Sequence, residues 1–449
     1  MQFHGNMRVN EKGHLEIGGC DTVDLARKFG TPLWVMDEDF IRQQCRDYKR
    51  VFIDGSHAGD VAYASKAFLT MAMAAIVMEE GLSLDIVSAG ELYTALKVGF
   101  PPERIYFHGN NKGPGELEMA VEFGVGRIVV DNFYELELLE KTVNRLTKGP
   151  VPIMLRLTPG VAAHTHEYIR TGQEDSKFGF SLSGEDARNA VQKTLEMDTV
   201  TLKGIHCHIG SQIFETDSFG VAAGVMMDFI GHIYKEEGYF IEELNLGGGF
   251  GIYYSEGDAP IPVEKYAETI ISTVCEKASE YDIKVPKIIV EPGRSIVGPA
   301  GTTLYTVGSI KDIPGIRKYA AVDGGMSDNI RPALYQAEYE AAIANKADRS
   351  PDELVSIAGK CCESGDMLIW NASLPEVTTG DVLAVFCTGA YGYSMSNNYN
   401  RLGRPAMVLV SGGQAELIVR RETYDDLLRN ELLPKRLAKN ASLTAASSV

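Results

Sequence analysis

Short apolar runs alternate with amphipathic segments from about residue 37 to residue 295. Segments such as GELYTALKVG and NFYELELLEKTVNRL carry apolar residues three and four positions apart, the spacing of a helix with one buried face. The runs between them are short and are bounded by turn residues, as expected for buried strands. This alternation predicts βα units on a parallel sheet.

Eight apolar runs follow this rule, and eight βα units suggest an α/β fold with a closed (β/α)8 TIM barrel over residues 37–300. The predicted strands are VAYASKAF (61–68), LSLDIVS (82–88), RIYFHG (104–109), RIVVDN (127–132), VPIMLRL (151–157), LKGIHCHIG (202–210), ELNLGGGF (243–250) and KIIVEPGR (287–294).

The pattern changes after residue 300, where turn residues rather than helices separate the apolar runs. Residues 301–449 are therefore predicted to form an all-β domain, a sandwich or a barrel. HLEIGG and TPLWVMDE near the start are also strand-like, so residues 1–36 are expected to pair with this second domain. The small polar residues at 437–449 predict a flexible tail.

The composition of the chain limits the kinds of partner that it can bind. The chain has 449 residues, 45% hydrophobic content and a formal charge of −18 without a basic run, which argues against nucleic acid and anionic membranes. No segment has the apolar length of a membrane span, and MQFHGNMRVNEKGH lacks the features of a signal peptide. Seven cysteines without framework spacing fit reduced thiols. We expect a cytoplasmic enzyme.

Polar residues cluster at the C-terminal ends of the predicted strands. In a barrel these ends form the rim where active sites are built, so the rim is the candidate site. The residues are Lys66, Asp85, His108, Arg156, His208, Gly247 to Gly249, Glu291 and Arg294.

Lys66 ends an apolar strand, where a solvated lysine would have no reason to lie. Partial burial and nearby cations would lower its pKa towards the range in which a lysine is a nucleophile able to form a Schiff base. The alternative is a surface lysine at a strand end.

Two further motifs suggest a phosphate-bearing cofactor. LNLGGGFG places Gly247, Gly248 and Gly249 after the seventh strand, where bare backbone N–H groups can cradle phosphate; a tight turn is the alternative. EPGR places Glu291 and Arg294 on the same rim. A carboxylate facing a pyridine nitrogen would keep the ring protonated as an electron sink, unless the pair is only a structural ion pair.

Two His-x-His pairs, His164/His166 and His206/His208, require a competing hypothesis, because alternate strand positions can hold a metal. A barrel metallohydrolase is therefore an alternative class, although its first strand would carry the pair. We expect no metal. His208 could instead stack on a cofactor ring, with Ser211 offering a hydroxyl to phosphate.

The second domain carries two dense motifs, CCESGD and GAYGYSMSNNYN. They lie far from the barrel in sequence, so their chemistry can reach the rim only where domains or subunits meet. We expect a homodimer with the site at the interface.

Taken in order, YASKA, HIGSQ, GGGFG, EPGR, CESGD and GAYGYSMSNNYN resemble the diaminopimelate decarboxylase family, within the alanine racemase-like class of pyridoxal 5'-phosphate enzymes. The resemblance spans nearly the whole chain. It implies decarboxylation of meso-2,6-diaminopimelate to L-lysine and carbon dioxide. The alternatives are a related decarboxylase of ornithine, lysine or arginine, and a catalytically silent relative that keeps the fold for binding.

The resemblance also implies roles for individual residues. Lys66 would be the Schiff-base lysine, His208 the ring-stacking residue, Glu291 the partner of the pyridine nitrogen, and Cys362 the residue that aids reprotonation; the register from Glu363 selects Cys362 over Cys361. The implied cofactor contacts also include Asp85, Ser211, Gly247, Gly248, Gly249, Arg294 and Tyr391. The implied substrate contacts are Arg294, Arg331, Tyr335, Glu363 and Tyr391, with Cys362 and Glu363 donated by the partner subunit.

Overall fold

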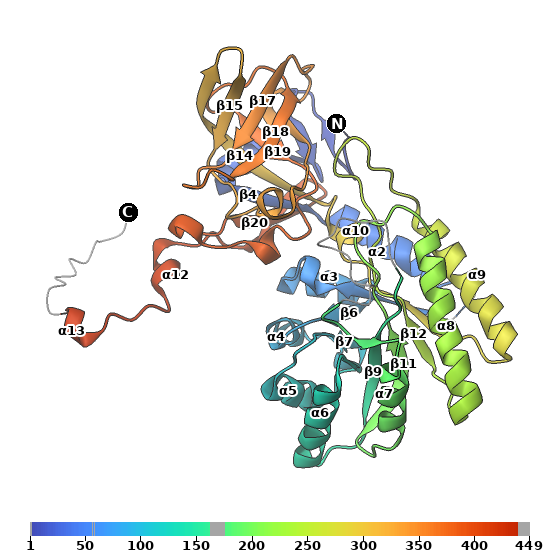
Figure 1. Ribbon diagram of the computed structural model, residues 1–449. Coiled ribbons are helices and arrows are strands. Elements are labelled where there is room, and N and C mark those ends of the chain that lie inside the picture. The colour runs from blue at the N-terminus through green and yellow to red at the C-terminus, as the bar shows by residue number, and fades with distance from the viewer. Residues whose placement is uncertain (1, 56, 58, 162–175, 439–449) are drawn as a thin grey trace.

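The computed structural model describes residues 2–55, 57, 59–161 and 176–438 (Figure 1). The chain forms a barrel surrounded by helices and a second, strand-rich part that lies above the barrel in Figure 1. The pair His164/His166 lies outside the described residues.

Eight parallel strands form the barrel. Their hydrogen-bonded order runs β5-β6-β7-β8-β9-β11-β12-β13, and β13 pairs with β5, which closes the ring. The predicted closed barrel with a separate all-β domain is therefore confirmed. The strands are β5 (Gly59–Ala64), β6 (Ser83–Ile86), β7 (Ile105–Phe107), β8 (Arg127–Val130), β9 (Val151–Thr158), β11 (Val200–His206), β12 (Glu243–Asn245) and β13 (Lys287–Val290). The short strand β10 (Phe180–Ser181) pairs with the C-terminal end of β9 and is not part of the ring.

Helices follow the strands and cover the outside of the barrel. A helix that precedes the first strand, α2 (Glu38–Phe52), packs on β5, β13 and α9, so it covers the seam where the barrel closes. The others are α3 (Met71–Glu79), α4 (Ala89–Lys97), α5 (Pro114–Phe123), α6 (Phe133–Leu146), α7 (Asp186–Leu195), α8 (Asp217–Glu237), α9 (Val263–Tyr281) and the short α10 (Arg294–Val297).

The barrel interior is layered. Side chains from several strands meet in a small apolar cluster of Ala62, Tyr106, Val129, Met154 and Ile289. Because side chains two positions apart on a strand point the same way, the next layer towards the C-terminal rim comes from residues two positions further along. That layer is polar, and it includes Asp85, His108, Asp131, Arg156, His206, Asn245 and Glu291.

A second, mostly antiparallel sheet has the order β18-β17-β15-β14-β4-β20-β21, with β19 on β14 and β16 on β19. The long strand β14 pairs with β4 and β19 through its first half and with β15 through its second half. The strands are β14 (Gly301–Ile313), β15 (Arg317–Val322), β16 (Ala341–Ile343), β17 (Glu353–Ala358), β18 (Met367–Leu374), β19 (Val382–Val385), β20 (Ala406–Ser411) and β21 (Gln414–Val419).

The N-terminal segment divides its strands between two sheets. As expected from TPLWVMDE, β4 (Leu33–Asp37) pairs with β14 and β20 of the second sheet. HLEIGG does not join the second sheet, because β2 (Leu15–Ile17) pairs with β1 (Arg8–Val9) and β3 (Cys20–Asp21) in a sheet of their own, but Leu15 and Ile17 pack in one hydrophobic core with the second part. Gly18 and Gly19, both with positive φ, turn the chain back at once into this hairpin. Helix α1 (Thr22–Phe29) then leads to β4.

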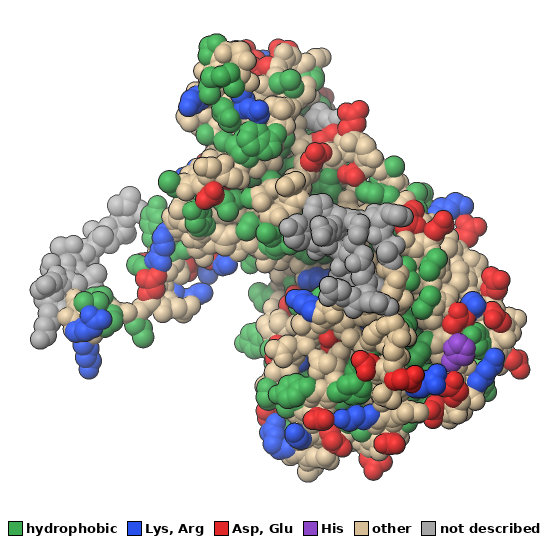
Figure 2. All heavy atoms as spheres, in the orientation of Figure 1, with side chains coloured by type: hydrophobic (Ala, Val, Ile, Leu, Met, Phe, Trp, Pro, Cys, Tyr) green, Lys and Arg blue, Asp and Glu red, His purple; other side chains and the backbone are tan. Residues whose placement is uncertain are grey.

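The last described elements are short helices. After α11 (Arg331–Tyr335) in the second part, α12 (Tyr424–Leu428) and α13 (Lys435–Ala438) project away from the body in Figure 1. Most of the predicted tail lies outside the described residues. No described helix is long and apolar enough to cross a membrane. Figure 2 shows acidic and basic side chains intermixed over the barrel face.

A buried ion pair fixes one side of the rim. Lys112, between β7 and α5, contacts Glu135 of α6 at 2.8 Å, and its ammonium also donates to the carbonyls of Gly109 and Val129. Both side chains are almost fully buried. Burial raises the pKa of Glu135 above its ordinary value although Lys112 opposes this shift. The ammonium therefore joins the loop after β7, strand β8 and helix α6.

We expect Lys112→Met to lower the free energy of unfolding by about 3 to 5 kcal/mol, because it leaves a carboxylate buried without its cation. Denaturant unfolding of the full chain measures this change. The control is Lys193→Met, which removes an exposed ion pair to Glu137 and should cost less than about 1 kcal/mol. Equal small losses in both variants would contradict the structural role of the buried pair.

Candidate active site

A cavity of about 650 Å³ opens at the C-terminal end of the barrel strands, where the second part of the chain meets the rim. Barrel residues and residues from the second part both line it, so neither part makes the cavity alone. The lining includes Lys66, Phe178, His208, Ser211, Gln212, Phe214, Tyr254, Ser255, Asp258, Arg294, Arg331, Tyr335, Ala337, Glu338, Tyr391 and Met395.

Lys66 enters this cavity from a 3-10 turn, η1 (Ser65–Ala67), directly after β5. Its amine donates to Asp85 Oδ2 at 2.8 Å, and Asp85 itself is buried on the neighbouring strand β6. Enclosure disfavours the charged amine, but Asp85, Tyr391 and Glu291 outweigh it and raise the pKa of Lys66. The expected lowering of this pKa is therefore wrong, because the neighbours of the amine are anionic rather than cationic.

Contacts on both sides hold the Lys66 turn. Ala64 N donates to Pro292 O at 3.0 Å, and a Cβ on Gly293 would lie 2.9 Å from the Ala64 side chain. Only glycine allows the EPGR turn to approach so closely. From the second part, Tyr391 N donates to Ala67 O at 2.8 Å. The turn that carries the amine is thus bound to the last barrel strand and to the second sheet.

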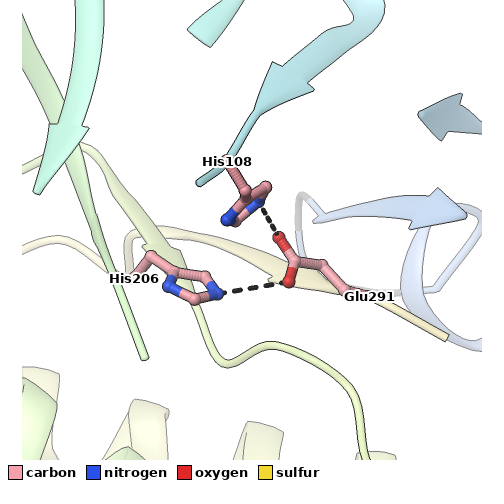
Figure 3. Close-up of side chains that lie close together, drawn as sticks. All are labelled: His108, His206 and Glu291. Atoms are coloured by element: carbon pink, nitrogen blue, oxygen red, sulfur yellow. Dashed lines mark hydrogen bonds and ion pairs between the residues drawn. The ribbon is translucent and has the colours of Figure 1, made fainter. Parts of the chain in front are cut away.

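Glu291 lies between two histidines (Figure 3). Its Oε1 is 2.7 Å from His108 Nε2, its Oε2 is 3.2 Å from His206 Nε2, and Asn245 Nδ2 donates to Oε1 at 2.7 Å. Burial alone would raise the pKa of Glu291, but His108 and His206 hold it well below its ordinary value. Glu291 is therefore a buried carboxylate that carries its charge.

The glycine run lies beside the predicted ring-stacking histidine. Gly248 N donates to His208 Nδ1 at 3.2 Å, which fixes the plane of the imidazole at the cavity wall. Burial, together with Lys66 and Arg156, lowers the pKa of His208 well below its ordinary value, so the ring is neutral. A Cβ on Gly248 would lie 2.2 Å from Glu291 O, so glycine is required where the two loops touch.

Two arginines face the cavity. Arg294 Nη2 donates to Ser211 Oγ at 2.9 Å and Nη1 to Tyr254 at 2.7 Å, while its buried Nε has no hydrogen-bond partner among the described residues. Arg331, at the start of α11, donates to Tyr339 at 2.5 Å and lies over the ring of Tyr254. These guanidinium groups give the cavity lining two fixed positive charges, beside the carboxylates of Asp258 and Glu338.

Tyr335 and Tyr391 also line the cavity. Tyr391 has φ of +60°, a conformation that non-glycine residues rarely adopt and that is often retained at functional sites. Its ring stacks on the guanidinium of Arg294, 4.9 Å from the ring centroid. Some of the predicted cofactor and substrate residues line this cavity and others do not. Lining it are Lys66, His208, Ser211, Arg294, Arg331, Tyr335 and Tyr391, whereas Asp85, Gly247 to Gly249 and Glu291 are not part of the lining.

Cys362 and Glu363 are exposed and do not line the cavity within this chain. Cys362 N donates to Asn400 Oδ1 at 2.7 Å, which ties CCESGD to the GAYGYSMSNNYN loop. Cys361 is buried, and burial raises the pKa of its thiol to about 11. Because the thiolate is the reactive form, Cys361 is unsuited to chemistry, and Cys362 is the accessible thiol.

The fold and this site define a class. Residues 38–298 match the family model described as "Pyridoxal-dependent decarboxylase, pyridoxal binding domain". That span begins at α2 and ends just after α10, so it covers the whole barrel. The molecule is a pyridoxal-dependent decarboxylase, which decides against the barrel metallohydrolase considered from the His-x-His pairs.

Relatives with high sequence identity show which family of pyridoxal-dependent decarboxylases the chain belongs to. The chain is 57% identical to diaminopimelate decarboxylase of Bacillus subtilis over 96% of its length and 98% of that relative, and 46% identical to diaminopimelate decarboxylase of Staphylococcus aureus over 95% and 99%. A solved diaminopimelate decarboxylase of M. jannaschii shares 38% identity with a TM-score of 0.89 over 96% and 98% of the chains. The chain belongs to the diaminopimelate decarboxylase family.

A lysine/ornithine decarboxylase structure from Vibrio vulnificus has a TM-score of 0.73 over 87% of this chain and 98% of that chain, but only 21% identity. At this identity the likeness shows a shared fold and nothing about substrate.

The residues present fit pyridoxal 5'-phosphate. An amine enters a cavity of sufficient size, and a charged carboxylate lies on the same rim. The unpartnered Nε of Arg294 and the hydroxyl of Ser211 offer donors for an anion. The rim thus offers separate groups for an aldehyde, a ring nitrogen and a phosphate.

Sequence reasoning missed two site residues. Asn245 lies within the run ELNLGGGF, where an inward-facing polar residue on a buried strand was the available signal. Tyr254, which contacts both cavity arginines, follows the glycine run in GIYYSEG and carries no signal of its own. His206 was considered only as a metal ligand, whereas its contact is to Glu291.

Burial lowers the pKa of His206 from 6.5 to about 4, against the attraction of Glu291. The folded state thus favours the neutral ring, so stability is fully present above pH 6.5 and is lost as pH falls towards about 4. Between pH 7 and pH 4 the free energy of unfolding should therefore fall by up to about 3 kcal/mol less in His206→Gln than in the unmodified protein. Urea unfolding at both pH values measures this difference. Parallel stability curves for both proteins would contradict the assignment.

Proposed function

We propose that this chain decarboxylates meso-2,6-diaminopimelate to L-lysine and carbon dioxide, the last step of lysine biosynthesis, with pyridoxal 5'-phosphate as cofactor. The single observation that carries the proposal is the Lys66 amine, bound to Asp85 in a cavity that Arg294 and Arg331 also line. The names of the close relatives support the same reaction, and an M. jannaschii diaminopimelate decarboxylase was solved with L-lysine.

Lys66 would hold the cofactor covalently through its amine, with Asp85 accepting from that nitrogen while it is protonated. Ser211 and Arg294 would bind the phosphate, with Gly249 from the loop of Gly247, Gly248 and Gly249, because Gly247 N and Gly248 N already donate to Asn245 and His208. When bound, pyridoxal phosphate supplies an electron sink for the pair of electrons left when the substrate carboxylate departs.

Two barrel residues would orient and tune the ring. His208 is neutral and fixed by Gly248, so it presents a flat apolar face to the cavity. Glu291 is charged in spite of its burial, so it would keep a proton on the ring nitrogen. Neither residue needs to change its charge during the reaction.

The arginines that line the cavity would select the substrate. Diaminopimelate carries a second amino-acid head, and its distal carboxylate requires a guanidinium, which Arg331 supplies beside Tyr335 and Tyr391. A decarboxylase of ornithine, lysine or arginine would instead need an acidic pocket without this arginine. The charge of the cavity therefore favours diaminopimelate over the basic amino acids.

The chain would act in the cytoplasm as a homodimer. Within one chain Cys362 and Glu363 are exposed and lie outside the cavity lining, so they are available to the site of a second copy. Cys362 of the partner subunit would return a proton to the carbon that lost carbon dioxide, and the partner's Glu363 would bind the distal ammonium of the substrate.

We expect Lys66→Ala to abolish lysine formation from meso-diaminopimelate, because no other group can hold the cofactor aldehyde at this position. Lysine release by the purified full-length enzyme measures the loss. The control is Lys141→Ala on the exposed face of α6, which should leave the rate unchanged. Substantial residual turnover by Lys66→Ala at saturating cofactor would contradict the assignment.

We expect Arg331→Ala to raise the KM for meso-diaminopimelate roughly 10- to 100-fold, because it removes a charge-assisted hydrogen bond to the distal carboxylate. The visible absorbance of bound cofactor should remain. Arg331→Lys should recover part of the loss, and Arg349→Ala, an exposed arginine, serves as control. A parallel loss of cofactor absorbance in Arg331→Ala would indicate a structural or cofactor role instead.

A further inference from the structure

Three side chains from strands that are not neighbours meet inside the barrel (Figure 3). His108 follows β7, His206 ends β11, and Glu291 follows β13. The two imidazole centroids are 4.7 Å apart at an angle of 68°, and each ring directs its Nε2 at a different oxygen of the carboxylate. The side chains of all three residues are at most 6% exposed.

This cluster could also be considered as a metal site, because two imidazoles and a carboxylate are common zinc ligands. The geometry favours direct contact between the side chains. His108 Nε2 and Glu291 Oε1 are only 2.7 Å apart, whereas two ligands of a tetrahedral zinc ion, each about 2.0 Å from the metal, lie about 3.3 Å apart. Asn245 Nδ2 occupies the same oxygen at 2.7 Å.

The protonation of His206 follows from its two nitrogens. Its Nδ1 is buried and has no hydrogen-bond partner among the described residues, while its Nε2 faces Glu291 Oε2 at 3.2 Å. A neutral ring therefore carries its hydrogen on Nε2, since the other tautomer would direct a lone pair at the carboxylate. His206 thus donates a hydrogen bond to Glu291 as a neutral ring, and the negative charge stays on the carboxylate.

His206 and Asn245 each direct an N–H group at one carboxylate that has almost no contact with solvent, and His108 Nε2 lies 2.7 Å from the same carboxylate without hydrogen-bond geometry. A buried carboxylate with fewer donors takes up a proton, because desolvation penalises its charged form. The charge of Glu291, and with it the proton on the cofactor ring, therefore depends on residues that do not touch the ring.

We propose that His108 and His206 are positioning residues of the decarboxylase that act through Glu291. His206 donates a hydrogen bond to Oε2, His108 Nε2 lies 2.7 Å from Oε1, and together they keep the carboxylate ionised against the ring nitrogen. This inference rests on the proposed function. It goes further in assigning the strength of the electron sink to two imidazoles outside the cavity lining.

The test compares His206→Gln, which keeps an amide N–H donor, with His206→Leu, which keeps neither donor nor acceptor. We expect His206→Leu to lower kcat roughly 10- to 100-fold with little change in KM, the range typical for loss of a partner that orients an active group. His206→Gln should recover most of the rate. His108→Gln and His108→Leu should follow the same order.

A double-mutant cycle separates action through Glu291 from a general packing effect. In a Glu291→Gln background, His206→Leu should cause no further loss of kcat. His14→Leu is the matched control, because His14 also pairs with a carboxylate, Asp21 at 2.9 Å, but lies in the N-terminal sheet. It should leave both kcat and the cofactor spectrum unchanged.

The cofactor spectrum gives a readout that does not need turnover. The pH titration of the visible band of bound pyridoxal phosphate should shift in His206→Leu and return in His206→Gln, even if meso-diaminopimelate is not the substrate. Equal effects of Leu and Gln, or independent losses in the Glu291→Gln background, would overturn the proposal. Stoichiometric metal in the purified enzyme whose removal abolishes the shift would also overturn it.

Discussion

The pairing of β13 with β5 is the contact on which the rest of the site depends. It joins the last barrel strand to the first, with Val290 opposite Val61, and Ala64 N then bonds to Pro292 O just beyond the ladder. Through this closure Glu291 and Lys66, which lie far apart in the sequence, share one rim. Gly293 makes the approach possible, since a side chain there would collide with Ala64. An open sheet with the same strands would separate the amine from the carboxylate.

Closure also creates an electrostatic problem, because it buries a layer of charged side chains above the apolar interior of the barrel. Two of these buried charges meet partners from other elements: Lys112 meets Glu135 of α6, and Glu291 meets two imidazoles. The second part of the chain completes the arrangement, because Tyr391 bonds to the Lys66 turn and Arg331 joins Arg294 of the barrel in the cavity lining. A lining with both guanidinium and carboxylate groups suits a substrate that carries both amines and carboxylates.

Much of the fold could be predicted from the sequence, because the eight barrel strands are short buried runs separated by amphipathic helices, and that pattern is local. Contacts that form only when the barrel closes could not be predicted from the sequence. No local pattern indicates that Asp85 would neutralise Lys66, so the expected direction of its pKa was wrong, and none indicates that His206 would contact Glu291. HLEIGG packs in the core of the second part but forms its strand pairs in a separate sheet, because a strand-like run does not specify its pairing partner. The roles of Arg331, Tyr335 and Cys362 came from the family resemblance alone.

The account therefore rests on a covalent bond between one amine and the cofactor, and chemical trapping tests that bond most directly. Holoenzyme reduced with borohydride and digested to peptides should carry the pyridoxyl label on the peptide that contains Lys66. Lys112, the buried lysine of the neighbouring rim, should remain unlabelled because Glu135 and two carbonyls occupy its ammonium. Label on Lys112 or on any other lysine, or no label at all in yellow active enzyme, would contradict the account.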